Sequence, residues 1–320
     1  MRMKSSLAGA KELPGKVFNW PGRKSVFSCW QLYVLLLPAL AWALVFAYYP
    51  MYGLIIAFKD FKIRAGIMDS PFAQPLFKYF GQFFSTSIAV QAIRNTVVIS
   101  LESLLFAFPV PIVFAILLNQ ISKSGMRKII QTISYAPYFM SNVVVVSVIT
   151  VMFSANGVVN NLIMKAGGQA TMFTSLPEWF RVLFIGSNIW QSMGFNAVIF
   201  IAALLTIDPT YYEAATIDGA SRFQQILHID IPLIIPTVIL MFILQIGNIM
   251  NVGYEKAFLM QNGSNTVVSE LISTYVYKVG LQSAQYSFAT AVGLFNSVTS
   301  FVVLIAANFI AKKASNISIF

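Results

Sequence analysis

The side chains that most often carry catalysis or bind metals are scarce in this sequence. Cys29 and His228 are the only residues of their kinds, so we expect neither a metal cluster nor a disulfide nor a Cys–His nucleophilic pair within the chain. No stretch has the G-x-x-x-x-G-K-S/T pattern of a phosphate-binding loop. The sequence therefore predicts no catalytic site and no cofactor in this chain, and work driven by ATP would have to come from another subunit.

Polar and aromatic side chains within apolar stretches indicate a different chemistry, the binding of a hydroxylated ligand. Such a ligand needs hydrogen bonds together with flat stacking surfaces. Two stretches supply them, and the polar residues of the second are spaced i, i+3 and i+6 along one side of a helix. The same pattern is typical of amides that bind across a subunit interface, and the sequence leaves both interpretations open. The candidates are Asn188, Trp190, Gln191 and Asn196 in the first stretch and Gln245, Asn248 and Asn251 in the second.

Glu102 is the sole carboxylate inside a predicted membrane span. It could belong to a proton relay or to a ligand pathway, because ionisable groups within a membrane are costly and are often functional. The alternative is a carboxylate turned into the helix bundle and bonded to its neighbours. One acid is thin evidence for proton coupling, so the sequence favours the bonded carboxylate.

Composition predicts an all-α integral membrane protein. Hydrophobic residues make up 58% of the chain and charged residues 10%, and the mean hydropathy is +0.74, which is far more apolar than a soluble domain. Crossing a bilayer takes about 20 apolar helical residues, and helices satisfy the backbone in lipid. Six stretches qualify as spans: 31–52, 90–118, 132–153, 181–206, 233–253 and 287–311.

The first span has a rival interpretation as a signal peptide, since Ala41-Trp42-Ala43 has the form of a cleavage site. The preceding basic segment is long, however, and the apolar run continues through Tyr52. We therefore expect the first span to be retained.

Basic residues cluster before the first span, where six Lys and Arg face only Glu12. This excess predicts a cytoplasmic N-terminus, and six spans would return the C-terminus to the same side. The net charge of +10 is then explained by Lys and Arg beside anionic lipid, and no nucleic-acid partner is expected.

A polar hairpin is predicted at 207–232, between the fourth and fifth spans. Asp208 followed by Pro209 is typical of a helix N-terminus. Gly219 would supply a left-handed stop. Ser221 and Gln224 have the spacing of a capping box that opens a second short helix.

The second short helix is expected to end at Pro232, before the fifth span begins. Phe223, Ile226 and Leu227 fall on one face at i, i+3 and i+4 spacing. The hairpin would thus project an apolar face from the membrane, flanked by Glu213, Asp218 and Arg222.

The spacing within this hairpin matches the EAA pattern (EAA-x3-G-x9-I-x-L-P) of binding-protein-dependent ABC importer permeases. Ile231 stands where the pattern usually has Leu, which is an isosteric exchange. The matching residues are Glu213, Ala214, Ala215, Gly219, Ile229, Ile231 and Pro232.

Nearly the whole chain resembles the LplB/YteP-type polysaccharide permease subfamily. The stretches that carry the resemblance are LLLPAL (35–40), YYPMYGLIIAFKDFK (48–62), RNTVVIS (94–100), QTISYAPYFMS (131–141), NGVVNNL (156–162), DPTYYEAATIDGASRFQQI (208–226) and YSFATAVGLFNS (286–297). The resemblance implies a type I ABC importer (MetI-like) fold with a permease core at 92–310 and a coupling loop at 207–232. The other parts would be a basic cytoplasmic segment (1–30), an accessory first helix (31–52) and a short cytoplasmic tail (311–320).

The resemblance also implies partners: a second homologous permease, two cytoplasmic ATPases that bind ATP and Mg, and an extracytoplasmic solute-binding protein. Substrates of the subfamily are mainly oligosaccharides, some with uronic acids. The residues expected to contact the ATPase are Glu213, Ala214, Ala215, Gly219, Ser221, Arg222 and Phe223. The alternatives are an ABC permease for a non-sugar solute, a secondary transporter or channel subunit, and, less favoured, a membrane enzyme.

The loops expected outside the bacterial cytoplasmic membrane are 53–89, 154–180 and 254–286. With Arg94 and Arg181 at their edges they carry nine basic residues against five acids. This excess could favour an acidic oligosaccharide or an acidic rim on the binding protein.

Overall fold

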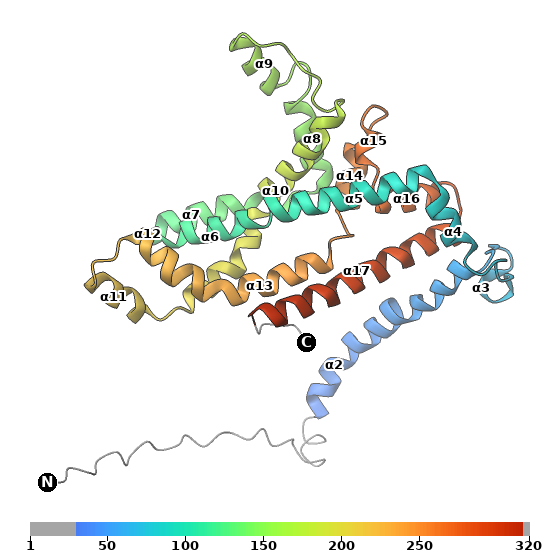
Figure 1. Ribbon diagram of the computed structural model, residues 1–320, viewed down its shortest axis with the longest axis horizontal. Coiled ribbons are helices and arrows are strands. Elements are labelled where there is room, and N and C mark those ends of the chain that lie inside the picture. Colours follow the sequence, from blue (N-terminus) through green and yellow to red (C-terminus); the bar gives the residue numbers. More distant parts are fainter. Residues whose placement is uncertain (1–29, 316–320) are drawn as a thin grey trace. The chain divides into compact units, whose positions relative to one another are not determined.

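The computed structural model describes residues 30–315 of the chain, which are helical apart from turns, loops and two isolated β-bridges (Figure 1). The all-helical prediction is confirmed for this part of the chain. The basic segment before the first span, including Cys29, and residues 316–320 of the predicted tail lie outside the described residues. The chain divides into two compact units, residues 1–53 and 54–320.

The described part of the first unit is the start of a continuous helical segment, Trp30–Phe58, whose last residues belong to the second unit. Its successive sections are α2 (Trp30–Ala43), the π-helical turn η1 (Leu44–Tyr48) and the 3-10 section η2 (Tyr49–Phe58). The segment is long and apolar enough to cross a membrane.

Near the start of the second unit, an isolated β-bridge between Lys59 and Phe72 encloses a short helix, and a second bridge joins Lys62 to Gly66. The helices that form the long apolar segments of this unit are α5 (Ser87–Phe106), α6 (Pro109–Asn119), α10 (Pro177–Leu205), α13 (Ile231–Gly247) and α17 (Tyr286–Ser315). The shorter helices are α3 (Gly66–Asp69), α4 (Lys78–Ser85), α7 (Ser124–Tyr135), η3 (Ala136–Phe139), α8 (Asn142–Met152), α9 (Val158–Lys165), α11 (Pro209–Ile217), α12 (Arg222–Gln225), η4 (Ile226–Asp230), α14 (Tyr254–Met260), α15 (Thr266–Ser269), α16 (Ile272–Tyr277) and η5 (Lys278–Gln282).

Within the described residues, five helical segments are long and apolar enough to span a membrane, and a bent pair makes a sixth if it counts as one span. The pair lies where the sequence predicted one apolar span at 132–153. Its two parts, Ser124–Phe139 and Asn142–Met152, meet at 99°. The bend follows from local chemistry: Met140 and Ser141 are extended, and the Ser141 hydroxyl accepts the Val144 N–H at 3.3 Å to start α8.

Helix α10 organises the packing of the second unit. It packs against α6, α13, α5 and α7, while α13 lies along α17 (Figure 1). One buried cluster joins Phe200 and Leu204 of α10 to Ala115 of α6 and Ile234 of α13. These apolar contacts fix the relative positions of the helices that line the cavity described below.

Close approach between α10 and α7 depends on Gly194. A Cβ atom at this position would lie 2.2 Å from the Ser134 carbonyl oxygen, which is a backbone atom that cannot move aside alone. Small residues at helix interfaces are how membrane helices pack closely, because lipid supplies little hydrophobic driving force. Gly186, on the same helix, has nothing within 4 Å of the equivalent position.

We predict that Gly194→Ala destabilises the protein, because the added methyl group must push α10 and α7 apart. Overpacking of this kind costs about 1–3 kcal/mol. Thermal unfolding of the purified protein in detergent should show a lower midpoint for this variant. Gly186→Ala is the matched control and should leave the midpoint unchanged or raise it, since alanine favours helix. Equal midpoints for both variants would contradict the close-packing argument.

Candidate functional site

The hairpin between α10 and α13 starts as predicted. Asp208 caps α11, its Oδ1 accepting the Thr210 N–H at 2.9 Å, and Pro209 occupies the first turn. Hydrogen bonds from Thr210 hold the pKa of the Asp208 carboxyl below its usual range. Gly219 has a φ of 75°, the left-handed conformation that glycine adopts without strain. The local signals for the first helix and its end are therefore confirmed.

The second helix begins with the predicted capping box but does not end where the sequence indicated. Ser221 N–H donates to Gln224 Oε1 at 2.7 Å, and the Ser221 hydroxyl accepts the Gln224 N–H at 3.4 Å. The prediction that Pro232 separates this helix from the fifth span is wrong. A single helical segment runs from Arg222 to Gly247.

A π-helical turn explains how the helix continues through Pro232. In η4 the Ile231 N–H donates to the Ile226 carbonyl, one residue further back than in an α-helix. Proline normally stops a helix because it lacks an N–H and its ring clashes with the carbonyl four residues earlier. A widened turn just before the proline relieves that clash, and Pro232 then lies in the first turn of α13.

The expected ATPase-contacting residues lie together on this hairpin. Six of them are exposed and Ala215 is half-buried. The most exposed large hydrophobic side chains of the hairpin are Ile217, 86% exposed, and Phe223, 72% exposed. Of the predicted apolar face, Phe223 and Leu227 point to the surface, whereas Ile226 packs against the core cluster.

A buried carboxylate, which the sequence analysis missed, joins the two helices of this hairpin and attaches the hairpin to the end of α6. Asp230 is fully buried and accepts hydrogen bonds from the Tyr212 hydroxyl of α11 and from Gln120 Nε2, at 3.1 Å, beside the end of α6. Arg222 donates to the Gln120 carbonyl at 3.3 Å. The only signal in the sequence was an acid between two isoleucines just before a proline.

A cavity of about 290 Å³ lies between α5, α10, α13 and the segment that follows α13. It brings together five residues of the predicted ligand pathway, Asn188, Asn196, Gln245, Asn248 and Asn251. The other polar lining residues are neutral serines, Ser100, Ser103 and Ser192. Trp190 does not line the cavity and is 44% exposed. Such a lining can exchange hydrogen bonds with hydroxyl groups without a fixed charge.

Two of the amides differ in what else they contact. The Asn251 side-chain oxygen accepts from Asn296 Nδ2 of α17 at 3.2 Å. Asn248 donates only within its own helix end, to the Leu244 carbonyl at 3.2 Å. Helix α13 ends at Gly247, so Asn251 lies in the segment between α13 and α14 and not on the helix that the sequence predicted. Asn251 therefore joins this segment to α17 as well as lining the cavity, and Asn248 is the cleaner probe of the cavity itself.

Glu102 lies apart from this cavity. Its carboxylate is 3.4 Å from the Arg181 guanidinium of α10, and both side chains are about one-third exposed. The pair lines a separate pocket together with Glu178. The carboxylate thus has a basic neighbour. This arrangement agrees with the interpretation of Glu102 as a carboxylate bonded to its neighbours.

Lys256 of α14 is a second functional candidate that the sequence analysis did not single out. It is 2% exposed, and its ammonium donates to Asn188 Oδ1 at 2.7 Å and to Gln191 Oε1 at 2.6 Å. Burial lowers the pKa of this amine to about 8. Its position in the loop after the fifth span gave no local signal, because the two amides belong to α10.

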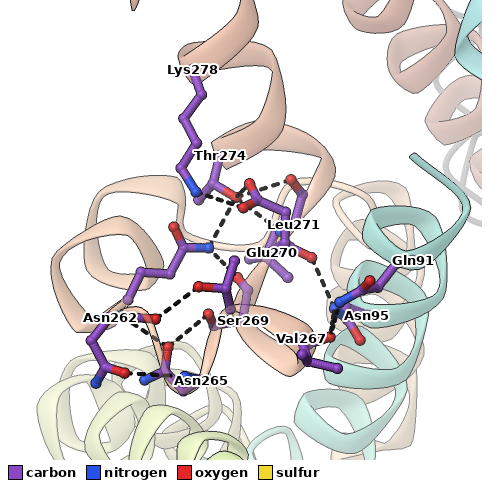
Figure 2. A network of polar contacts seen from close by, with 12 residues as sticks. Gln91, Asn95, Asn262, Asn265, Val267, Ser269, Glu270, Leu271, Thr274 and Lys278 are labelled. Carbon is purple, nitrogen blue, oxygen red and sulfur yellow. Dashed lines mark hydrogen bonds and ion pairs between the residues drawn. The ribbon is translucent and has the colours of Figure 1, made fainter. Parts of the chain in front are cut away.

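The segment around α15 and α16 is held by a dense polar network (Figure 2). The Glu270 carboxylate accepts from Lys278 at 2.5 Å and from Thr274 at 2.8 Å. Asn95 of α5 donates to the Val267 carbonyl at 2.9 Å and to the Glu270 carbonyl at 3.1 Å. The charge-assisted bond between Lys278 and Glu270 holds the segment internally, and the neutral bonds from Asn95 fix its backbone onto α5.

Comparison with known protein families shows which family this chain belongs to. The model of the family described as binding-protein-dependent transport system inner membrane component matches residues 107–316. The chain belongs to this family. It is thus a permease subunit of an ABC importer, an inner-membrane transport component built from apolar helices, as the sequence predicted.

Two relatives from Bacillus subtilis (strain 168) match along most of the chain. Protein LplB is 42% identical over 283 residues, which is 88% of each chain. The polygalacturonan/rhamnogalacturonan transport system permease protein YteP is 37% identical over 316 residues, covering 97% of this chain and 98% of the relative. The predicted subfamily is confirmed.

A solved structure agrees with the fold. It is a bacterial alginate ABC transporter in complex with an alginate pentasaccharide-bound periplasmic protein. The matching chain is 38% identical, with a TM-score of 0.84 over 92% of this chain and 99% of that chain. The predicted type I importer fold is therefore confirmed.

We predict that Tyr212→Phe weakens the attachment of the hairpin, because the buried Asp230 carboxylate loses one hydrogen-bond donor. Leaving a buried acceptor short of a donor costs about 1–3 kcal/mol. A lower thermal unfolding midpoint of the purified protein would show this loss. Tyr211→Phe, which alters the exposed neighbour, is the control and should behave as wild type. A Tyr212→Phe midpoint equal to that of the control would contradict the role of Asp230.

Proposed function

We propose that this chain forms half of the translocation pathway of an ABC importer for oligosaccharides that contain uronic acids. The observation that carries the proposal is full-length similarity, at 37% and 38% identity, to permeases of transporters for polygalacturonan/rhamnogalacturonan and for alginate. A cavity lined by amides and hydroxyls supports it, because these groups match the hydrogen-bonding needs of sugar hydroxyls.

The other half of the pathway is a second, homologous permease, and an extracytoplasmic solute-binding protein delivers the sugar. Two cytoplasmic ATPases bind ATP and Mg and contact the hairpin, which places the hairpin and both chain termini on the cytoplasmic side. Glu213 and Arg222 supply charge at this contact, and Phe223 supplies an apolar anchor. The exposure of these side chains on one short hairpin supports such a docking surface.

The continuous helix Arg222–Gly247 supplies the mechanical connection. Its first residues belong to the hairpin, and Gln245 near its other end lines the cavity. A displacement of the hairpin when the ATPases close on ATP is thus carried along one rigid element to the cavity wall. Asp230 couples the same movement to α6 through Gln120.

We predict that Glu213→Lys leaves assembly intact but reduces sugar uptake relative to ATP hydrolysis, because the reversed charge disturbs the ATPase contact. The measurement is uptake per ATP hydrolysed in proteoliposomes that contain the complete transporter. Gly219 offers a matched pair of backbone variants. Gly219→Asn tolerates the left-handed conformation and should retain coupling, whereas the β-branched Gly219→Val should lose it. Normal uptake by both Glu213→Lys and Gly219→Val would refute the coupling role of the hairpin.

We predict that Asn248→Leu lowers uptake while the complex still assembles, because the cavity loses one amide that meets the sugar. Loss of a single hydrogen bond to a neutral ligand group costs about 0.5–1.5 kcal/mol, or roughly a two- to twelvefold rise in KM. Uptake kinetics and co-purification of the partner subunits are measured on the same preparation. Loss of assembly instead would assign Asn248 to a subunit interface.

A further inference from the structure

Lys256 occupies an unusual position for a buried cation. It lies on α14, the first helix after the cavity-lining end of α13, and its ammonium contacts Asn188 Oδ1 at 2.7 Å. Asn188 itself lines the 290 Å³ cavity, as does Gly253, three residues before Lys256. The positive charge is therefore one side chain away from the cavity, at the end opposite the hairpin.

The charge of Lys256 has no carboxylate to balance it in the described part of the chain. Among residues 30–315 the ion pairs join Lys78 to Asp60, Arg181 to Glu102 and Lys278 to Glu270. The partners of Lys256 are two neutral amide oxygens. A buried charge without a counter-ion is costly, and a nearby anion would relieve that cost.

The hydrogen bond to Lys256 also decides which end of the Asn188 amide is left for a ligand. With Oδ1 bound to the ammonium, the amide has its N–H donors on its other end. Donors on a residue that lines a cavity suit an acceptor such as a carboxylate. A lysine that stabilises this orientation thus acts on the ligand through Asn188 as well as through its charge.

We propose that Lys256 is a specificity-determining residue that makes this cavity favour carboxylated oligosaccharides over neutral ones. The inference rests on the proposed function, the import of uronate-containing oligosaccharides, and names the group in this chain that recognises the acid. Lys256 balances the charge of a uronate near Asn188. It also holds the Asn188 amide in the orientation that donates to the carboxylate.

The state of Lys256 changes within an accessible pH range. Burial lowers its pKa to about 8. The amine is therefore charged at pH 7 and loses its proton as the pH rises through about 8. The attraction for a carboxylated ligand is therefore present below pH 8 and is lost above it. An arginine at this position would keep its charge throughout, because its pKa exceeds about 12.

Several other titratable groups surround α14. Helix α14 packs against α8, α10, α15 and α16, and α8 and α15 carry no titratable side chain. The titratable groups on the other packed elements, on α14 itself and in the adjoining α15–α16 segment are Glu178, Arg181, Tyr254, Glu255, Glu270, Tyr275, Tyr277 and Lys278. Of these, burial raises the pKa of Tyr275 further above its usual value, and Glu255 accepts from Asn142 at 2.6 Å.

The test uses the complete transporter with its binding protein in proteoliposomes and a pair of labelled ligands. One ligand is a short uronate oligosaccharide, and the other is the same molecule with its carboxylates methyl-esterified. For Lys256→Met we expect KM for the charged ligand to rise at least about tenfold, as loss of a charge-assisted bond implies. KM for the ester should stay within about twofold of wild type. Comparing each variant with wild type for the same ligand removes the selectivity of the binding protein.

The pH profile is the second readout. In wild type, KM for the charged ligand should rise between pH 7 and about 9, and Lys256→Arg should remove that rise while retaining uptake. Lys59→Met is the matched control, because Lys59 is also buried but donates to the backbone carbonyls of Ile67 and Met68, and Phe72 lies beneath it. Any effect of this control should be equal for both ligands.

The outcomes separate the two proposals. A wild-type transporter that takes up neither ligand contradicts the proposed function and the inference together. Uptake of the uronate by wild type, with Lys256→Met changing KM equally for both ligands or for neither, overturns the inference alone. A rise of KM with pH that persists in Lys256→Arg would also overturn it, because that rise would then come from a group other than Lys256.

Discussion

An unbroken helix from the surface hairpin to the cavity wall is the constraint on which the rest of this structure depends. Pro232 should have divided it, and the π-helical turn before the proline is what preserves it. The turn also brings Asp230 into a buried position where Tyr212 and Gln120 can bind its carboxylate. Continuity of the helix and anchoring of the hairpin thus have one local cause.

The polar groups of the membrane-spanning helices have two different roles. Asn95 and Ser100 of α5 bind backbone carbonyls of the segments that follow α13 and so hold the bundle together. The amides around the cavity make fewer bonds within the chain, and Gln245 and Asn248 are exposed to it. Polar side chains in a membrane protein are costly unless they have partners, so exposed amides in a cavity are consistent with ligand exchange.

Features set by neighbouring residues could be predicted from the sequence. The Asp208 cap, the left-handed Gly219 and the Ser221–Gln224 box depend on chain positions a few residues apart, and each was found. The apolar spans followed from length and apolar composition, with two exceptions. Extended residues at 140 and 141 divide one of them, and the fifth ends at Gly247 instead of continuing to 253. The end of the second hairpin helix was misplaced because the stop signal of a proline says nothing of a widened turn before it.

The buried charges could not be predicted because their partners are distant in sequence. Asp230 meets Gln120 from 110 residues away, and Lys256 meets Asn188 from 68 residues away. Chain periodicity carries no information on such pairs. It also placed Gln245, Asn248 and Asn251 on one helix, whereas α13 ends at Gly247 and only Gln245 lies on it. The EAA spacing found the hairpin, and tertiary packing alone reveals how the hairpin is attached.

The network of Figure 2 has a consequence for recognition by other proteins. Glu270, Thr274 and Lys278 fix the α15–α16 segment before any partner arrives, and Asn95 fastens it to a long helix. A surface that is already rigid loses little conformational entropy on association. The rate of association with a partner protein is then set by the complementarity of shape and charge, because no slow ordering of the segment is needed.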